Sequence, residues 1–250
     1  MKKFIRSLSM LLSICLCLFC FAGCGEETTT TQNNSSAVGD ASSVSEPTET
    51  VTSKKYTAEI TVKNMGKITV ELDGETAPIT TENFVKLAKS GFYNGLTFHR
   101  VISGFMVQGG DPNGNGTGGS DNDIKGEFSA NGVENNIKHL RGVISMARSG
   151  SAYEQYLAAG YKLSDLPQEA KQDIERAMNS ASSQFFIMHE TSPHLDGSYA
   201  AFGKVTEGMD VVNKIAEVPT AWGDKPFEAQ VMKSVTVDTQ GVEYDEPEKC

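Results

Sequence analysis

The chain has 250 residues, with 32 acidic and 22 basic side chains and a formal net charge of −10. This length is sufficient to bury a sizeable core within a single folded domain. The acidic balance leaves no basic surface for neutralising phosphates, which excludes nucleic acid as an expected partner.

Residues 1–23 have the pattern of a secretory leader. A basic start precedes an apolar run that ends at Ala22. That run covers about 15 residues, fewer than the roughly 20 that a membrane-spanning helix needs, so we expect cleavage. Phe21-Ala22-Gly23-Cys24 resembles a bacterial lipobox, although Phe21 replaces the usual aliphatic residue. We expect Cys24 to carry an acyl chain such as palmitate and to anchor an extracytoplasmic protein to the cell membrane. Ordinary cleavage would secrete the protein instead.

Residues 24–54 are predicted to be the lipidated cysteine followed by a disordered tether. The segment is mostly Glu, Thr, Ser, Asn and Gln, with too few large apolar residues to offset the entropy of ordering. The acidic tail at residues 241–250 is expected to fray. Four of the five cysteines lie in the leader or at its end and only Cys250 remains, so the folded domain should have no internal disulfide bond.

The folded domain, residues 55–240, is expected to begin with two strands joined by a turn at residues 64–67. Large apolar residues alternate with polar ones on both sides of this turn, which is the period of a strand. The alternating positions are Tyr56, Ala58, Ile60, Val62, Ile68, Val70 and Leu72. The pattern predicts a β hairpin.

Two helices and a final strand are expected elsewhere in the domain. The first helix begins at Pro78 and ends at Gly91, because proline favours the first helical position and glycine the position after the end. Its apolar face is formed by Phe84, Val85, Leu87 and Ala88. A second helix is predicted from Gly208 to Ala216 and a strand at residues 231–237.

Residues 152–180 break the strand pattern. Ala152 to Gly160 is predicted to form a short helix, and Ser164 or Asp165 to cap a second one. The apolar face of the second helix comprises Leu166, Ala170, Ile174, Ala177 and Met178. The pattern indicates a helical hairpin inserted in a loop.

The most informative segment runs from Tyr93 to Gly110 and ends in FHRVISGFMVQGG. It matches the cyclophilin signature at every specified position, and further pieces follow in that family's order. These pieces are Gly116–Gly119, Gly126–Phe128, Val143–Ala147, Ser183–Ile187, Leu195–Gly197 and Phe202–Val205. The chain therefore resembles the cyclophilin-type peptidyl-prolyl cis-trans isomerases over roughly residues 56–239.

The resemblance implies a mainly β fold. This fold is a closed eight-stranded antiparallel barrel capped by two helices, with the helical hairpin at 152–180 as an insertion. The substrate groove is expected on the outer face of the barrel. In the family the loop at residues 147–149 borders this groove, so the insertion should either shape substrate access or be a decoration without effect on the rate.

Isomerisation of an X-Pro bond breaks no covalent bond, so it needs no nucleophile, metal or cofactor. The barrier is about 18–20 kcal/mol because the amide nitrogen shares its lone pair with the carbonyl, and a hydrogen-bond donor to that nitrogen weakens the sharing. Arg100 is such a donor and is charged at any pH. An acceleration of about five orders of magnitude needs roughly 7 kcal/mol, more than one charged hydrogen bond supplies. An apolar proline pocket and a donor to the carbonyl are also required.

Matching the family residue by residue implies a catalytic set and a substrate-binding set. The catalytic set is Arg100, Phe105 and Gln108, with Gln108 as the carbonyl donor. The substrate-binding set is Met106, Ala147, Arg148, Gln184, Phe186, His194, Leu195 and Tyr199. Compared with the commonest eukaryotic pattern, His194 replaces tryptophan, Tyr199 replaces histidine and Arg148 replaces asparagine. We expect catalysis to survive these replacements.

The expected partners are proline-containing polypeptides, bound by a monomer that assists the folding of exported proteins. The alternative is a non-catalytic proline-peptide-binding or chaperone module at the cell surface, which could dispense with Arg100 or Gln108. A surface scaffold or adhesin is a third hypothesis, for which an intact groove has no purpose.

Three other motifs are interpreted as coincidental. Residues 114–119 fit G-x-G-x-x-G, but no helical pattern follows them. A calcium loop starting at Asp111 would need Glu at its twelfth position, which is Asn122. A triad of Ser183, His99 and Asp111 would lack a nucleophile elbow. No metal-ligand spacing is present, so no metal is expected.

Overall fold

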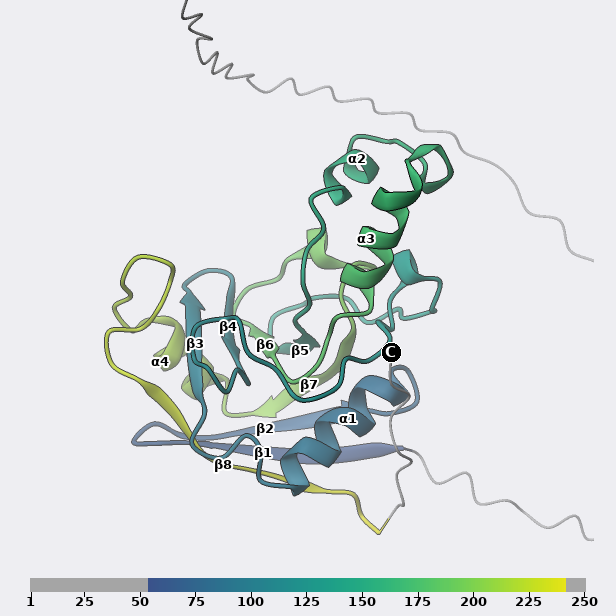
Figure 1. Cartoon of the computed structure of the whole chain (residues 1–250). Helices are drawn as coiled ribbons and strands as arrows, with labels where there is room; N and C mark the ends of the chain where they lie inside the picture. The colour runs from purple at the N-terminus through teal and green to yellow at the C-terminus, as the bar shows by residue number, and fades with distance from the viewer. Residues whose placement is uncertain (1–53, 242–250) are drawn as a thin grey trace, which may run out of the picture. The chain divides into compact units, whose positions relative to one another are not determined.

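The structure is a computed structural model, and it describes residues 54–241. Eight strands in this range form a closed barrel with the neighbour order β1-β2-β7-β5-β6-β4-β3-β8, and every pair is antiparallel (Figure 1). The strands are β1 (Lys55–Val62), β2 (Gly66–Asp73), β3 (Thr97–Ile102), β4 (Met106–Gly109), β5 (Val143–Met146), β6 (Phe185–Met188), β7 (Ala201–Glu207) and β8 (Gln230–Asp238). The predicted eight-stranded barrel is confirmed.

The first hairpin follows the alternation of its sequence. Tyr56 pairs with Leu72 and Ile60 with Ile68, and all four side chains are buried in the barrel interior. Asn64 in the turn has a φ of 62°, a left-handed conformation that asparagine tolerates better than most residues. The period-two pattern therefore decides which face of each strand enters the core.

Helix α1 (Pro78–Lys89) covers one side of the barrel, and α4 (Met209–Ala216) lies near β2, β3 and β4 (Figure 1). Phe84 of α1 is fully buried among aromatic rings, with its centroid 5.1 Å from that of Tyr93 and 5.5 Å from those of Phe185 and Phe202. The apolar face of the predicted helix thus joins the main core.

The N-terminus of α1 is capped by a residue far away in the sequence. The Glu127 carboxylate accepts hydrogen bonds from the backbone N–H of Ile79 (3.1 Å) and of Thr80 (2.8 Å), and from the Thr80 hydroxyl (2.6 Å). Burial raises the pKa of Glu127, while these hydrogen bonds work in the opposite direction. A carboxylate at this end satisfies backbone donors that the helix itself leaves unpaired.

The predicted insertion contains two helices, α2 (Glu154–Ala158) and α3 (Gln168–Met178). All five residues of the predicted apolar face are buried, and four of them form a small cluster with Phe128 and Ala200. The four are Leu166, Ala170, Ile174 and Met178. The predicted cap of the second helix is wrong. Ser164 and Asp165 lie in a preceding 3₁₀ turn, and α3 starts only after Pro167, without a side-chain cap. Proline suits a helix start through its restricted φ, so the helix begins later than the polar residues suggested.

The predicted leader, Cys24, the tether up to residue 53 and the tail from residue 242 lie outside the described residues. Within residues 54–241, no helix is both long and apolar enough to span a bilayer.

Candidate functional site

Strands β3 and β4 bring together the two polar side chains of the predicted catalytic set, Arg100 and Gln108. Arg100 pairs with Gln108 across the two strands, and the register shifts between Phe98 and Arg100. His99 and Val101, the neighbours of Arg100, are buried, whereas Arg100 itself is exposed. A local irregularity of this kind can re-aim a side chain, and here the guanidinium lies outside the barrel wall.

A cavity of about 180 Å³ lies on the outer surface of these strands. It is lined by Arg100, Phe105, Met106, Gln108, Ala147, Arg148, Phe186, Leu195 and Tyr199. Met106, Phe186 and Leu195 are buried, with 2%, 5% and 8% of their surface exposed, so they form an apolar floor. The structure thus gathers nine predicted site residues, from four separate parts of the chain, around one small apolar cavity with a cation at its edge.

A second cavity of about 350 Å³ continues from the first. The two share Gln108, Ala147 and Arg148, and the second also contains Gln184. Gln108 donates a hydrogen bond from Nε2 to Gln184 Oε1 at 2.9 Å. Since an amide nitrogen carries two hydrogens, Gln108 retains one for a substrate carbonyl. Together the two cavities form a groove that extends beyond the small apolar cavity.

The glycine-rich loop forms part of the wall of this second cavity. Gln184 Nε2 donates to the backbone oxygens of Gly116 (3.1 Å) and Gly118 (2.7 Å). The Asp111 carboxylate accepts from backbone N–H groups of Asn113, Asn115 and Gly116. Burial would raise the pKa of Asp111, but these donors outweigh it and lower the pKa. Asp111 therefore shapes the loop, and residues 54–241 contain no cluster of His, Cys, Asp and Glu suited to a metal.

Asp224 contacts the predicted catalytic arginine and was not anticipated from the sequence. Arg100 donates from Nε to Asp224 Oδ2 at 3.2 Å, and the Asp224 carbonyl accepts from the backbone N–H of Val101 at 2.8 Å. The terminal guanidinium nitrogens have no hydrogen-bond partner among residues 54–241, so they can donate to a substrate. No local signal could reveal this pair, because 124 residues separate its members.

Two predicted residues occupy different places around the groove. His194 does not line either cavity, and its ring stacks on that of Phe105 with centroids 5.7 Å apart. Tyr199 lines the smaller cavity and meets Phe186 edge to face at 5.7 Å. His194 can thus support the proline pocket from outside, while Tyr199 forms part of its wall.

Comparison with known proteins agrees with this geometry. The sequence model of the family described as "Cyclophilin type peptidyl-prolyl cis-trans isomerase/CLD" matches residues 57–158 and 170–237. The chain belongs to this family. The matched residues include every side chain that lines the two cavities. The residues outside the cyclophilin match, 159–169, lie within the insertion and run from the end of α2 through the first two residues of α3.

Individual relatives support the same assignment. A peptidyl-prolyl cis-trans isomerase of Helicobacter pylori J99 is 43% identical over 164 residues, which are 64% of this chain and 82% of the relative. "Peptidyl-prolyl cis-trans isomerase-like 2" of Rhizopus delemar is 38% identical over 174 residues, 69% of this chain, but the chain spans only 27% of that relative.

Among solved structures, a cyclophilin-type isomerase of Cryptosporidium parvum superposes with a TM-score of 0.58 at 29% identity. It covers 74% of this chain and 98% of its own. That protein was also crystallised in the presence of the dipeptide Ala-Pro, and this second structure superposes with a TM-score of 0.57.

Arg148 is one of the departures from the common cyclophilin pattern. Contacts on several sides hold its side chain in place. Its guanidinium lies over the rings of Tyr199 (4.9 Å) and Phe128 (5.3 Å). It pairs with Glu154 of α2 at 2.7 Å and donates from Nε to the Ser198 carbonyl at 3.0 Å. Only 5% of the side chain is exposed. This arginine therefore joins the inserted hairpin to the groove of the cyclophilin barrel.

His99, the neighbour of Arg100 in the cyclophilin signature, is 5% exposed. Neither ring nitrogen has a hydrogen-bond partner among the described residues. Burial is the main reason that the pKa of His99 is lowered. An enclosed imidazole whose charged form is disfavoured fits a role in packing.

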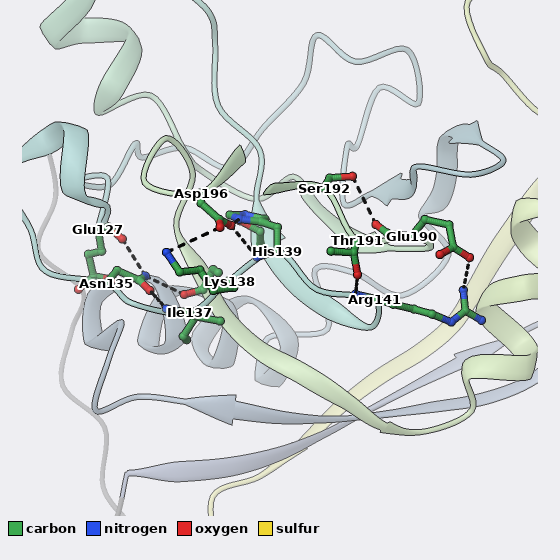
Figure 2. A network of polar contacts seen from close by, with 12 residues as sticks. Glu127, Asn135, Ile137, Lys138, His139, Arg141, Glu190, Thr191, Ser192 and Asp196 are labelled. Atoms are coloured by element: carbon green, nitrogen blue, oxygen red, sulfur yellow. Dashed lines mark hydrogen bonds and ion pairs between the residues drawn. The ribbon is translucent and has the colours of Figure 1, made fainter. Parts of the chain in front are cut away.

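A buried network supports the floor of the proline pocket. The His139 Nδ1–H donates to Asp196 at 3.1 Å, so Nε2 accepts from the Ser145 hydroxyl at 3.1 Å, and the imidazole stacks on Phe186 with centroids 6.1 Å apart. Figure 2 shows His139 beside Asp196, with Lys138 reaching the same carboxylate. The bonding order is that of a Ser-His-Asp triad. Ser145 is fully buried, however, so its hydroxyl cannot reach a substrate and the network is structural.

This network predicts a dependence of stability on pH. Burial lowers the pKa of His139 despite the opposing effect of Asp196, so folding favours the neutral imidazole. The stabilisation is fully present above the unfolded value of about 6.5 and is lost as pH falls through the lowered folded pKa. We expect the free energy of unfolding to fall more steeply from pH 7 to pH 5 in the unmutated chain than in His139→Gln, measured by urea denaturation.

The comparison with His139→Gln isolates this histidine, because His99 and Glu127 titrate in both proteins. The lowered pKa of His99 also makes the free energy of unfolding fall as the pH falls, whereas the raised pKa of Glu127 has the opposite effect. Equal pH slopes in the two proteins would contradict the assignment of His139 as a titrating group.

Proposed function

We propose that this chain is a foldase that accelerates cis-trans isomerisation of X-Pro bonds in exported proteins, held at a membrane by a lipid on Cys24. One observation carries the enzymatic part of the proposal. The structure combines a cation, an amide donor and an apolar floor around a single small cavity. Isomerisation requires these groups and no others.

The arrangement assigns a role to each group. The proline ring occupies the apolar cavity above Met106, Phe186 and Leu195, which releases the ring from water. Arg100 donates to the amide nitrogen as its lone pair leaves conjugation, and Gln108 donates to the carbonyl of the preceding residue. The charged hydrogen bond is worth about 1.5–3 kcal/mol and the pocket and carbonyl donor supply the remainder of the stabilisation.

Proline-containing polypeptides are the proposed substrates. The relative crystallised with Ala-Pro supports this class of ligand. The second cavity, next to Gln108, extends the groove and accommodates residues that precede the proline. A binding site for a chain segment suits a folding polypeptide, in which slow X-Pro isomerisation can limit the rate.

The proposed location rests on sequence alone. The leader pattern of residues 1–23, the lipobox-like Phe21-Ala22-Gly23-Cys24 and the polar segment up to residue 54 suit a domain tethered outside the cytoplasm. Proteins emerging from the secretion machinery would then be the clients, and the protein would act as a monomer.

Activity and anchoring are tested separately on the full chain. The full chain should raise the isomerisation rate of a short X-Pro peptide above background. Binding of the peptide without any rate increase would favour the non-catalytic module. In bacterial cells fed an alkyne palmitate analogue, the chain should be labelled and recovered with membranes. Cys24→Ala should abolish the label and Cys250→Ala should retain it; label in Cys24→Ala would contradict the anchor.

A further inference from the structure

A short hairpin between α4 and β8 borders the active site. Thr220 bridges to Pro226, and the Ala221 N–H donates to the Lys225 carbonyl at 2.7 Å. At its tip, Gly223 has a φ of 80° and Asp224 a φ of 63°, so the chain turns sharply. We call residues 219–228 the tip hairpin. Figure 1 shows it in yellow-green beside β3.

The tip hairpin carries the two most exposed large apolar side chains among residues 54–241. Trp222 is fully exposed, with a relative accessibility of 101%, and Phe227 is 72% exposed. The other large exposed apolar side chains in this range are between 42% and 57% exposed. A tryptophan held entirely in water loses the stabilisation that burial would bring, and such side chains commonly mark binding surfaces.

The tip hairpin is fixed to the catalytic strand. Asp224, two residues after Trp222, bonds Arg100 through its carboxylate and Val101 through its carbonyl. Lys225 Nζ donates to the Gly114 carbonyl at 3.2 Å, which ties the hairpin to the glycine-rich loop. Trp222 therefore lies next to the site on a turn whose position is fixed by these hydrogen bonds.

The groups of the site follow one another across the barrel surface in a fixed order. Gln184, immediately before β6, contacts Gln108 of β4. Gln108 is opposite Arg100 in β3, and Arg100 contacts Asp224. The second cavity lies at the Gln184 end and the tip hairpin at the other end. In this order of contacts, Arg100 comes between the second cavity and the tip hairpin.

This order gives a bound polypeptide its direction. The carbonyl beside Gln108 belongs to the residue before the proline, and the nitrogen beside Arg100 belongs to the proline itself. Residues before the proline therefore extend toward the second cavity, and residues after it pass Arg100 toward the tip hairpin. We propose that Trp222 binds apolar side chains that follow the proline in a client polypeptide. The proposal rests on the isomerase roles of Arg100 and Gln108 and not on export.

Trp222 provides its own probe, because it is the only tryptophan in the chain. Three tryptophan-free peptides share one X-Pro centre. The first carries Leu residues at the second to fourth positions after the proline, the second carries Ser there, and the third carries the Leu residues before the proline. With the full chain, only the first should shift the emission to shorter wavelength and reduce quenching by acrylamide. Equal shifts with the first and third peptides, or none with the first, would overturn the proposal.

Turnover gives a second, independent readout. Trp222→Ala should raise KM for the first peptide about fivefold, as expected for loss of one aromatic contact, with kcat nearly unchanged. A short peptide that ends one residue after the proline should be unaffected. Leu163→Ala removes another exposed apolar side chain, on the insertion, and should leave KM unchanged for both peptides. Equal KM values for Trp222→Ala and the unmutated chain would overturn the proposal.

The controls separate this inference from the assignments around it. Failure of the unmutated chain to turn over the short peptide would overturn the isomerase assignment from which the direction is derived. An emission shift with anionic phospholipid vesicles alone, and none with the first peptide, would assign Trp222 to a lipid surface and overturn the proposal.

Discussion

Replacing Arg100 by alanine should lower kcat/KM for an X-Pro peptide by about 10- to 150-fold, the loss expected when one charged hydrogen bond of 1.5–3 kcal/mol disappears from the transition state. The bond to the amide nitrogen strengthens as conjugation is lost, so the reduction should appear mainly in kcat. The measurement is a peptide isomerisation assay at several substrate concentrations.

The fold should tolerate this change. The Arg100 side chain is 44% exposed and its ion-pair partner among residues 54–241, Asp224, is 43% exposed, so the pair contributes no more than about 1 kcal/mol to stability. Arg100→Lys keeps the charge but loses the planar guanidinium group. Its kcat/KM should therefore lie between those of the unmutated chain and Arg100→Ala. Activity of Arg100→Ala within twofold of the unmutated chain would show that the guanidinium is not the donor.

Arg148→Ala should lower the free energy of unfolding by about 2–4 kcal/mol, because it removes a nearly buried guanidinium from an ion pair and two aromatic faces. The change leaves Glu154, which is 30% exposed, without its cation. It also removes the contact that joins α2 to Tyr199 and Ser198. Urea denaturation measures the loss.

Arg176 supplies the matched control for this substitution. Its side chain is 77% exposed and pairs with Asp173 one helical turn away. Arg176→Ala should cost less than about 0.5 kcal/mol. If Arg148→Ala were no more destabilising than Arg176→Ala, the stacked guanidinium would contribute nothing to the fold. A change of peptide specificity without loss of stability would instead assign Arg148 to the groove alone.

Local patterns predicted most of the secondary structure because each depends on neighbouring residues. Alternation between Tyr56 and Leu72 was enough for the first hairpin, and Pro78 marked the start of α1. The apolar face of α3 was also predicted correctly. The predicted start of α3 was wrong, because the helix begins after Pro167 and not at the polar residues Ser164 and Asp165.

By itself, the sequence determined the family and named the residues that line the cavity, since the signature from Tyr93 to Gly110 is a continuous run. Only the tertiary structure decided what holds those residues in place. Asp224 beside Arg100, Glu154 beside Arg148 and Asp196 beside His139 are contacts between segments that follow no local period. Closure of the barrel brings them together, and periodicity along a chain carries no information about which distant loops will meet.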